Sequence, residues 1–288
     1  MATLLDKLCA AHRQAGAMGL EAASIQALGD LRGVDAAGAA ALLAAQAELG
    51  QWLAAALGPG GDNSLAGLAA ALEDLARRPA CLGCATCCRV SSPTLYAEDL
   101  ALVGEGGLPR QALYALRPGE RVYSARLGRH FALDGDLIKL REAAGGGCLF
   151  LEGSRCGLYA HRPLQCRHLE CWAGRHAGQL EGRPRLSRRD LFAQDPTALA
   201  LLGEYDLRLP GEELAQVFQE AAQGGDPAPA LALLELDHRL RAGIAARYGY
   251  PPQEQDLLLG RPAWVVARAH GLTLALDGQG RPCLSAGQ

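Results

Sequence analysis

Eight of the ten cysteines in this 288-residue sequence lie in two groups, in the segment from Cys81 to Cys171. The first group has the sequence CLGCATCC, and the second has the sequence CLFLEGSRCGLYAHRPLQCRHLEC. A C-x-x-C pair lets two sulfurs converge on one ion across a tight turn. We therefore expect a metal centre whose candidate ligands are Cys81, Cys84, Cys87, Cys88, Cys148, Cys156, Cys166 and Cys171.

Zinc and iron both fit this set of thiols. Zinc takes four ligands in a tetrahedron, and C-x-x-C pairs commonly supply two of them. Cys81, Cys84 and Cys87 also have the C-x-x-C-x-x-C spacing with which ferredoxin-like chains hold three corners of an iron–sulfur cubane, although Cys88 then replaces the usual continuation. The expected cofactor is therefore a zinc or iron ion, or a [4Fe-4S] cluster.

The number of thiols exceeds the four that one tetrahedral ion needs. Adjacent Cys87 and Cys88 do not easily direct both sulfurs to one terminal position, so we expect one of them to bind a second ion or to bridge two ions. His161 and His168 are alternatives to a distal cysteine. Clustered thiolates need compensating cations. The arginines close to the candidate ligands are Arg89, Arg155, Arg162 and Arg167.

Two simpler roles compete with metal binding. Free cysteines often pack in protein cores as small hydrophobic residues. A C-x-x-C pair such as Cys81 and Cys84 also occurs as a redox dithiol, because the motif lowers a thiol pKa. The regular spacing favours metal ligation over both.

Composition predicts a soluble, cytoplasmic protein with no membrane partner. The first twenty residues contain Asp6, Lys7, His12 and Arg13, which a secretory signal would not carry in its apolar part. No apolar stretch reaches the roughly 20 residues that a membrane helix needs. Cytosolic thiols are kept reduced, so the cysteines are expected to bind metal rather than to form disulfides.

Nucleic acid is not the expected partner, and the sequence indicates no particular protein partner. The formal net charge is -3, which excludes a global attraction to polyanions. A local basic stretch from Arg155 to Arg189 includes RPRLSRR, but no aromatic residues alternate with the arginines as they do in single-strand binding surfaces. An adaptor that binds nucleic acid and contains a structural zinc, with Arg185, Arg188 and Arg189 as its contacts, remains a second alternative.

The elements that must position the cysteines are mainly helical. Leucines recur at helical spacing in residues 65–75 and 228–248, and those from Leu42 to Leu57 indicate one long helical segment. Two hairpins are predicted, one joining residues 130–133 to 137–140 through Asp134 and Gly135, the other near the C-terminus. We expect a mainly α fold with a small β element: a helical N-terminal segment (1–80), a cysteine-cluster domain (81–190) and a helical C-terminal segment packing on the core (191–288).

CLGCATCC together with CLFL, CGLY, HRP and CR closely resembles the widespread bacterial CxxCxxCC, or YkgJ-type, family of zinc- or iron-chelating cysteine-cluster domains. The resemblance covers roughly Cys81 to Leu169. It implies metal binding by the candidate ligands named above, from Cys81 to Cys166. The inclusion of Cys171 follows from spacing alone. The framework residues that accompany the cysteines in this family correspond to Tyr159, Arg162, Pro163 and Arg167.

The spacing of the cluster predicts a metal-binding protein whose centre holds the fold together or carries iron for redox chemistry. Similar cysteine clusters occur in flagellin lysine methylases. The first alternative is therefore an iron–sulfur-dependent enzyme that modifies a protein or peptide, although the chain has no methyl-donor glycine loop.

Overall fold

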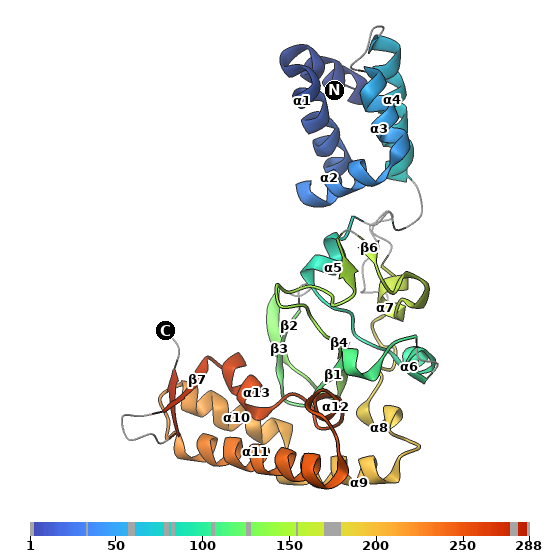
Figure 1. Cartoon of the computed structure of the whole chain (residues 1–288). Helices are drawn as coiled ribbons and strands as arrows, with labels where there is room; N and C mark the ends of the chain where they lie inside the picture. Colours follow the sequence, from blue (N-terminus) through green and yellow to red (C-terminus); the bar gives the residue numbers. More distant parts are fainter. Residues whose placement is uncertain are drawn as a thin grey trace. The chain divides into compact units, whose positions relative to one another are not determined.

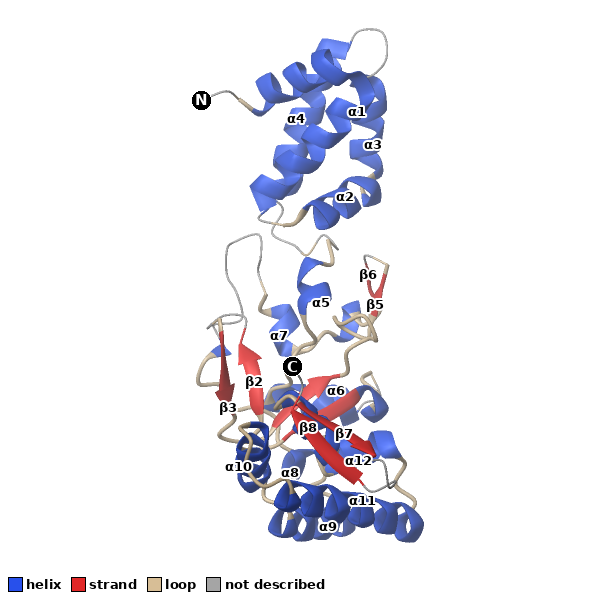
Figure 2. Ribbon diagram, turned by 90° about the vertical axis from the view of Figure 1, so that its left-hand side faces the viewer, coloured by secondary structure: helices blue, strands red, loops and turns tan. Residues whose placement is uncertain are grey.

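The computed structural model describes residues 3–32, 34–56, 61–77, 81, 84–104, 107–124, 128–153, 155–169, 180–276 and 282–286. Helices take up 61% of these residues and strands 13%, which confirms the mainly α class with small β elements (Figures 1 and 2). None of the described helices is long and apolar enough to cross a membrane.

The chain forms two compact units, each built from segments that are distant in the sequence. The first unit comprises Met1–Ser92, Glu142–Ala160 and Cys166–Glu181. The second comprises Pro93–Arg141, His161–Gln165 and Gly182–Gln288. All the candidate ligand cysteines that the structure describes belong to the first unit.

Helices at the N-terminus make up most of the first unit. They are α1 (Leu4–Arg32), α2 (Ala36–Ala45), α3 (Ala47–Ala56) and α4 (Gly61–Arg77). The helical spacing in residues 65–75 is confirmed, because Leu65, Leu68, Leu72 and Leu75 are each at most 1% exposed and pack in the core of the bundle. Burial of a leucine side chain contributes about 1.5–3 kcal/mol, so this face of α4 stabilises the bundle strongly.

The prediction of one helical segment from Leu42 to Leu57 is wrong, because the helix breaks at Gln46. This residue has an extended backbone (φ -103°, ψ 99°) and separates α2 from α3. The break redirects α3 so that it packs along α4 while Leu42 and Leu49 both remain in the core. Leu57 lies outside the described residues.

Short elements complete the part of the first unit that contains the cysteines. They are α5 (Thr86–Val90), β5 (Leu151–Glu152), β6 (Arg155–Cys156) and the end of α7 (Leu164–Arg167). β5 and β6 form a small antiparallel pair.

The second unit contains two antiparallel strand pairs near its start. The first is β1 (Leu113–Leu116) with β4 (Leu137–Leu140), and the second is β2 (Arg121–Ser124) with β3 (Arg129–Ala132). The predicted hairpin between residues 130–133 and 137–140 is therefore wrong, although both segments contain strands. β4 has Ile138 and Leu140 in the core, and pairing with the equally buried β1 satisfies its backbone groups there.

Helices and a terminal hairpin form the rest of the second unit. Its remaining elements are η1 (Ala97–Asp99), α6 (Leu100–Gly104), η2 (Arg110–Ala112), α8 (Arg188–Leu191), α9 (Pro196–Arg208), α10 (Gly211–Ala222), α11 (Ala228–Tyr248), α12 (Pro252–Leu258), α13 (Ala263–Ala269), β7 (Leu272–Leu276) and β8 (Pro282–Ala286). The helix at 228–248 is confirmed, and it ends at Gly249 in the left-handed conformation (φ 74°). The pairing of β7 with β8 confirms the terminal hairpin.

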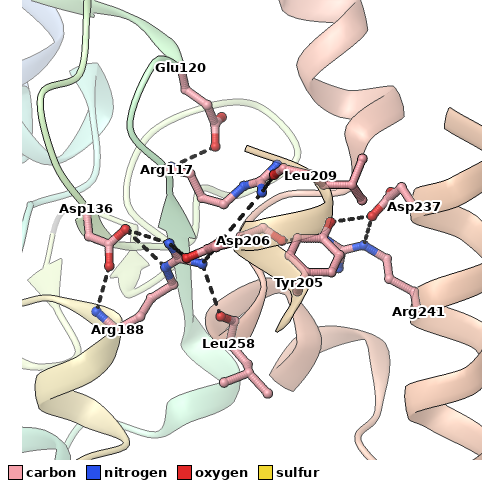
Figure 3. A network of polar contacts seen from close by, with 11 residues as sticks. Arg117, Glu120, Asp136, Arg188, Tyr205, Asp206, Leu209, Asp237, Arg241 and Leu258 are labelled. Carbon is pink, nitrogen blue, oxygen red and sulfur yellow. Dashed lines mark hydrogen bonds and ion pairs between the residues drawn. The ribbon is translucent and has the colours of Figure 1, made fainter. Parts of the chain in front are cut away.

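A network of buried ion pairs ties the second unit together (Figure 3). Arg188, only 2% exposed, donates to Asp136 from Nε and Nη2 (3.0 and 2.9 Å) and to Asp206 from Nη1 and Nη2 (3.1 and 2.9 Å). Burial lowers the pKa of Arg188, but the two carboxylates raise it more, so the net shift is upward and the guanidinium stays charged.

A second group of side chains in the same unit surrounds Asp237. This carboxylate accepts from the Tyr205 hydroxyl, from Arg241 Nε (2.7 Å) and from the backbone N–H of Ala263 (2.8 Å). The last contact places the charge at the N-terminus of α13, where it is favourable. His238, the neighbour of Asp237, is exposed. The contacts around Asp237 thus join α9, α11 and α13.

Candidate metal centre

The first group of cysteines leads into α5. Ala85, which precedes this helix, is buried and has a left-handed backbone (φ 62°), an uncommon conformation for a residue with a side chain. This turn places Cys87 and Cys88 in the first half of α5, where their sulfur atoms lie 3.9 Å apart. Cys87 is exposed and Cys88 is half-buried.

The N-terminal bundle supports this turn directly. Asp35 caps α2 by accepting from the backbone N–H of Gly38 (2.6 Å). A Cβ atom on Gly38 would stand 2.5 Å from Thr86 Oγ1 and 3.2 Å from the Cys84 carbonyl oxygen, so a side chain there would displace Thr86 and press on the cysteine turn. Cys84 also packs against the leucine core of the bundle. The N-terminal helices therefore help to hold the cysteine motif in place.

The second group of cysteines meets the first at Cys148. Its backbone N–H donates to the Cys88 carbonyl oxygen (2.7 Å) across 60 residues of sequence. Gly147 has φ +77°, and a Cβ atom there would stand 2.7 Å from the same carbonyl oxygen. The Ser92 hydroxyl adds a second link by donating to the Glu142 carboxylate (3.1 Å). The two groups thus come together in the folded chain.

Cys156 is positioned by the small β5–β6 pair. It lies opposite Leu151 in that pair, and Leu151 follows Cys148 by three residues. The turn is closed by hydrogen bonds from Leu151 N to Cys148 O (3.1 Å) and from Gly157 N to Phe150 O (2.9 Å). Cys148 and Cys156 are therefore held on one compact structure.

The thiols influence one another electrostatically. The pKa of Cys87 is raised mainly by its side-chain contact with Cys88, and negative charge on Cys88 adds to the shift. Burial is the main cause that raises the pKa of Cys148, and negative charge on Cys156 and Cys87 adds to it. Several thiolates in such proximity repel one another, and a bound cation would offset that repulsion.

The arginine beside the first cysteine group contacts backbone rather than sulfur. Arg89 Nη1 donates to the Cys84 carbonyl oxygen (3.3 Å). Arg155 is exposed on β6, opposite Glu152. Arg89 therefore brings a positive charge to the cysteine turn and also braces it.

The remaining candidate ligands differ in exposure and in the unit to which they belong. Cys81 and Cys166 are half-buried, and Cys171 lies outside the described residues. His161 is exposed in the second unit, where its ring lies against Gly107. Within the described part of the chain, no group of three or more His, Cys, Asp or Glu side chains is arranged to hold a metal ion.

The donor set nevertheless suits zinc or iron. Thiolate is a preferred ligand of both metals. With Zn–S bonds of about 2.3 Å, two ligands of one tetrahedral ion lie about 3.8 Å apart. The observed 3.9 Å between the sulfurs of Cys87 and Cys88 is close to this separation, so the adjacent thiols are compatible with one shared ion as well as with two.

The central segment has the features of a cysteine-rich metal-binding domain. Residues 80–183 match the family model CxxCxxCC, described as a putative zinc- or iron-chelating domain. The match supports a zinc- or iron-chelating function for this part of the chain. No curated protein and no solved structure matches the chain.

Several residues that build the site have no metal-ligand chemistry of their own. Gly38 and Gly147 permit the two close backbone approaches, and neither belongs to a recognisable ligand motif. The glycine run before Cys148 is the one sequence signal for such an approach. The role of Gly38 depends on a contact between segments that are distant in sequence, which spacing does not indicate.

Proposed function

We propose that the first unit binds zinc or iron through thiolates drawn from both cysteine groups. The ligands are taken from Cys81, Cys84, Cys87, Cys88, Cys148, Cys156, Cys166 and Cys171. The hydrogen bond between Cys148 N and Cys88 O supports this proposal most directly, because it joins the two groups at their centre. The match of residues 80–183 to the chelating family supports it independently.

Bound metal would cross-link two segments that are distant in the sequence. Within the first unit, residues 84–92 meet residues 142–156 through short backbone and side-chain hydrogen bonds. A shared ion would add strong bonds between them, and such bonds contribute directly to folding free energy. We propose a cytoplasmic location, where reduced thiols are available for the metal.

Metal analysis of anaerobically purified protein tests the proposal. We expect about one zinc or iron ion per chain or more. Cys88→Ser and Cys148→Ser should each lose most of the bound metal, because each removes a thiolate at the junction of the two groups. Cys283→Ser, in β8 of the second unit, is the matched control and should retain it. Substoichiometric zinc and iron in the parent protein would refute the proposal.

An iron–sulfur-dependent enzyme that modifies a protein or peptide is the second candidate. The exposure of Cys87 favours it, because a centre that solvent reaches can also be reached by an external ligand. Broad visible absorbance near ~400 nm that bleaches with dithionite would support it. A colourless protein containing only zinc would exclude it.

The nucleic-acid alternative loses one of its predicted contacts. Arg188 is buried and bound to Asp136 and Asp206, so it cannot reach a phosphate without breaking that network. Arg185 binds Asp134 (3.4 Å), and Arg189 is exposed. Part of the local basic charge is therefore compensated within the protein.

A further inference from the structure

A groove in the second unit lies between α10 and the β2–β3 ribbon, whose residues fall between the two cysteine groups in the sequence. Its volume is about 680 Å³. Figure 2 shows the end of the ribbon close to α10. Four consecutive residues, 130–133, line one wall, and the exposed face of α10 lines the other. The groove is part of neither cysteine group.

The ribbon has one solvated face and one packed face. Arg121 pairs with Ala132, and Tyr123 pairs with His130, so these four side chains share a face, and all four are exposed. Phe131 and Leu133 point to the other face, and Leu133 is buried. Gly119 and Arg121 on the β2 side line the groove together with residues from both faces of β3, so the groove borders the solvated face of the ribbon and extends to the edge of β3.

The backbone of this edge is available for hydrogen bonding. Leu133 directs its N–H to Glu120 O (3.1 Å) and its C=O to Gly119 N (2.8 Å), which are both on the β2 side. Bonding direction alternates along an antiparallel strand, so His130 and Ala132 direct their N–H and C=O groups to the opposite edge. No backbone partner occupies that edge among the described residues.

The wall formed by α10 is polar and acidic. Leu214 and Phe218 are buried on the other side of the helix. The groove side carries Glu212, Gln216, Gln219, Glu220 and Gln223, a helical stripe with two carboxylates and three amides. Gln216 Nε2 donates to the Glu220 carboxylate (2.9 Å) and fixes it in place. This wall favours a ligand with cationic and hydrogen-bonding groups.

His270 contributes a further unpaired polar atom to the lining. Its ring lies 6.4 Å from the Phe218 ring, and its Nε2 is buried with no hydrogen-bond partner among the described residues. Burial is the main cause that lowers the pKa of His270, followed by the positive charge of Arg121, so the imidazole is neutral at pH 7. A neutral imidazole adds no positive charge to the groove.

We propose that this groove binds an extended peptide with basic side chains, which adds to β3 as a third strand and faces the acidic stripe of α10. Main-chain hydrogen bonds to an open strand edge give affinity in this mode of recognition, and the flanking side chains give specificity. A four-residue strand spans about 13 Å at about 3.3 Å per residue, so a short segment of partner chain is sufficient.

Fluorescence anisotropy with a labelled, capped hexapeptide of alternating lysine and valine tests the proposal on the full chain. We expect saturable binding of this probe. A lysine–proline hexapeptide of equal charge should not bind, because proline cannot donate to a strand edge. A glutamate–valine hexapeptide should bind at least about tenfold more weakly, because its charges oppose those of α10.

Variants of the groove separate strand addition from general charge attraction. Ala132→Pro removes an edge N–H and should weaken probe binding at least about tenfold. Glu220→Lys should weaken it similarly, whereas Glu213→Lys, an exposed residue of α10 outside the groove, should change it less than about twofold. Circular dichroism checks that each variant is folded. If Ala132→Pro is unfolded, the comparison of Glu220→Lys with Glu213→Lys tests the proposal. Absence of saturable binding, equal binding of the proline peptide, or equal effects of Glu220→Lys and Glu213→Lys would overturn the proposal.

Discussion

Replacing Arg188 with methionine is expected to lower the free energy of unfolding by about 3–5 kcal/mol. Methionine has a similar length but no charge, so it leaves Asp136 and Asp206 without their shared cation. Asp136 is only 11% exposed and loses two hydrogen bonds from the Arg188 side chain, while the bond from the Arg188 backbone N–H remains. Arg117 still lies 3.7 Å from Asp206, so most of the cost is expected at Asp136. Urea denaturation monitored by circular dichroism measures the change.

Arg183→Ala is the matched control for this prediction. Arg183 also forms a short ion pair, 2.8 Å from Glu98, but the two side chains are 44% and 43% exposed. Solvent screens such a pair, so we expect a loss of about 1 kcal/mol or less. Similar losses for Arg183→Ala and Arg188→Met would show that burial does not strengthen the Arg188 network.

Local periodicity predicted these helices because the spacing of apolar residues within one short stretch determines which side of a helix is buried. The leucines from Leu65 to Leu75 recur at helical spacing and are buried together. Residues 228–248 form one helix that stops at Gly249, as the glycine and the following prolines indicated. Each of these features depends only on residues within a few turns of one another.

Strand pairing could not be predicted in the same way. The segments around Asp134 and Gly135 have the composition of a hairpin, yet each strand pairs with a segment that precedes both. Asp136 binds Arg188, 52 residues away, directly after this turn. Long-range burial and ion pairing therefore outweighed the local turn preference.

The candidate site shows the same division between local and long-range information. The spacing of the cysteines indicates candidate metal ligands, because C-x-x-C pairs are local features. The junction of the two groups depends on a backbone contact between Cys88 and Cys148, which no local pattern encodes. The neighbours of Arg188 in the sequence are basic, so the sequence predicted a basic stretch there. Its acidic partners, Asp136 and Asp206, lie elsewhere in the sequence.

Replacing Gly147 with alanine is expected to lower the free energy of unfolding by about 3 kcal/mol and to release most of the bound metal. A left-handed backbone costs a non-glycine residue about 1–2 kcal/mol, and the loss of the Cys148–Cys88 hydrogen bond costs about 1 kcal/mol more. The added Cβ would stand 2.7 Å from Cys88 O and 3.0 Å from Arg89 O, so α5 and the second cysteine group must move apart. Denaturation and metal analysis of the purified variant measure the two effects.

Gly146→Ala separates the backbone cost from the packing cost. Gly146 also has a positive φ (+80°, compared with +77° for Gly147), but no atom lies within 4 Å of a Cβ built there. Its replacement should therefore cost only the roughly 1–2 kcal/mol of the left-handed backbone and should leave the metal content unchanged. Equal loss of metal from both variants would mean that the flexibility of the glycine run, and not the close approach of Gly147 to Cys88, brings the two cysteine groups together.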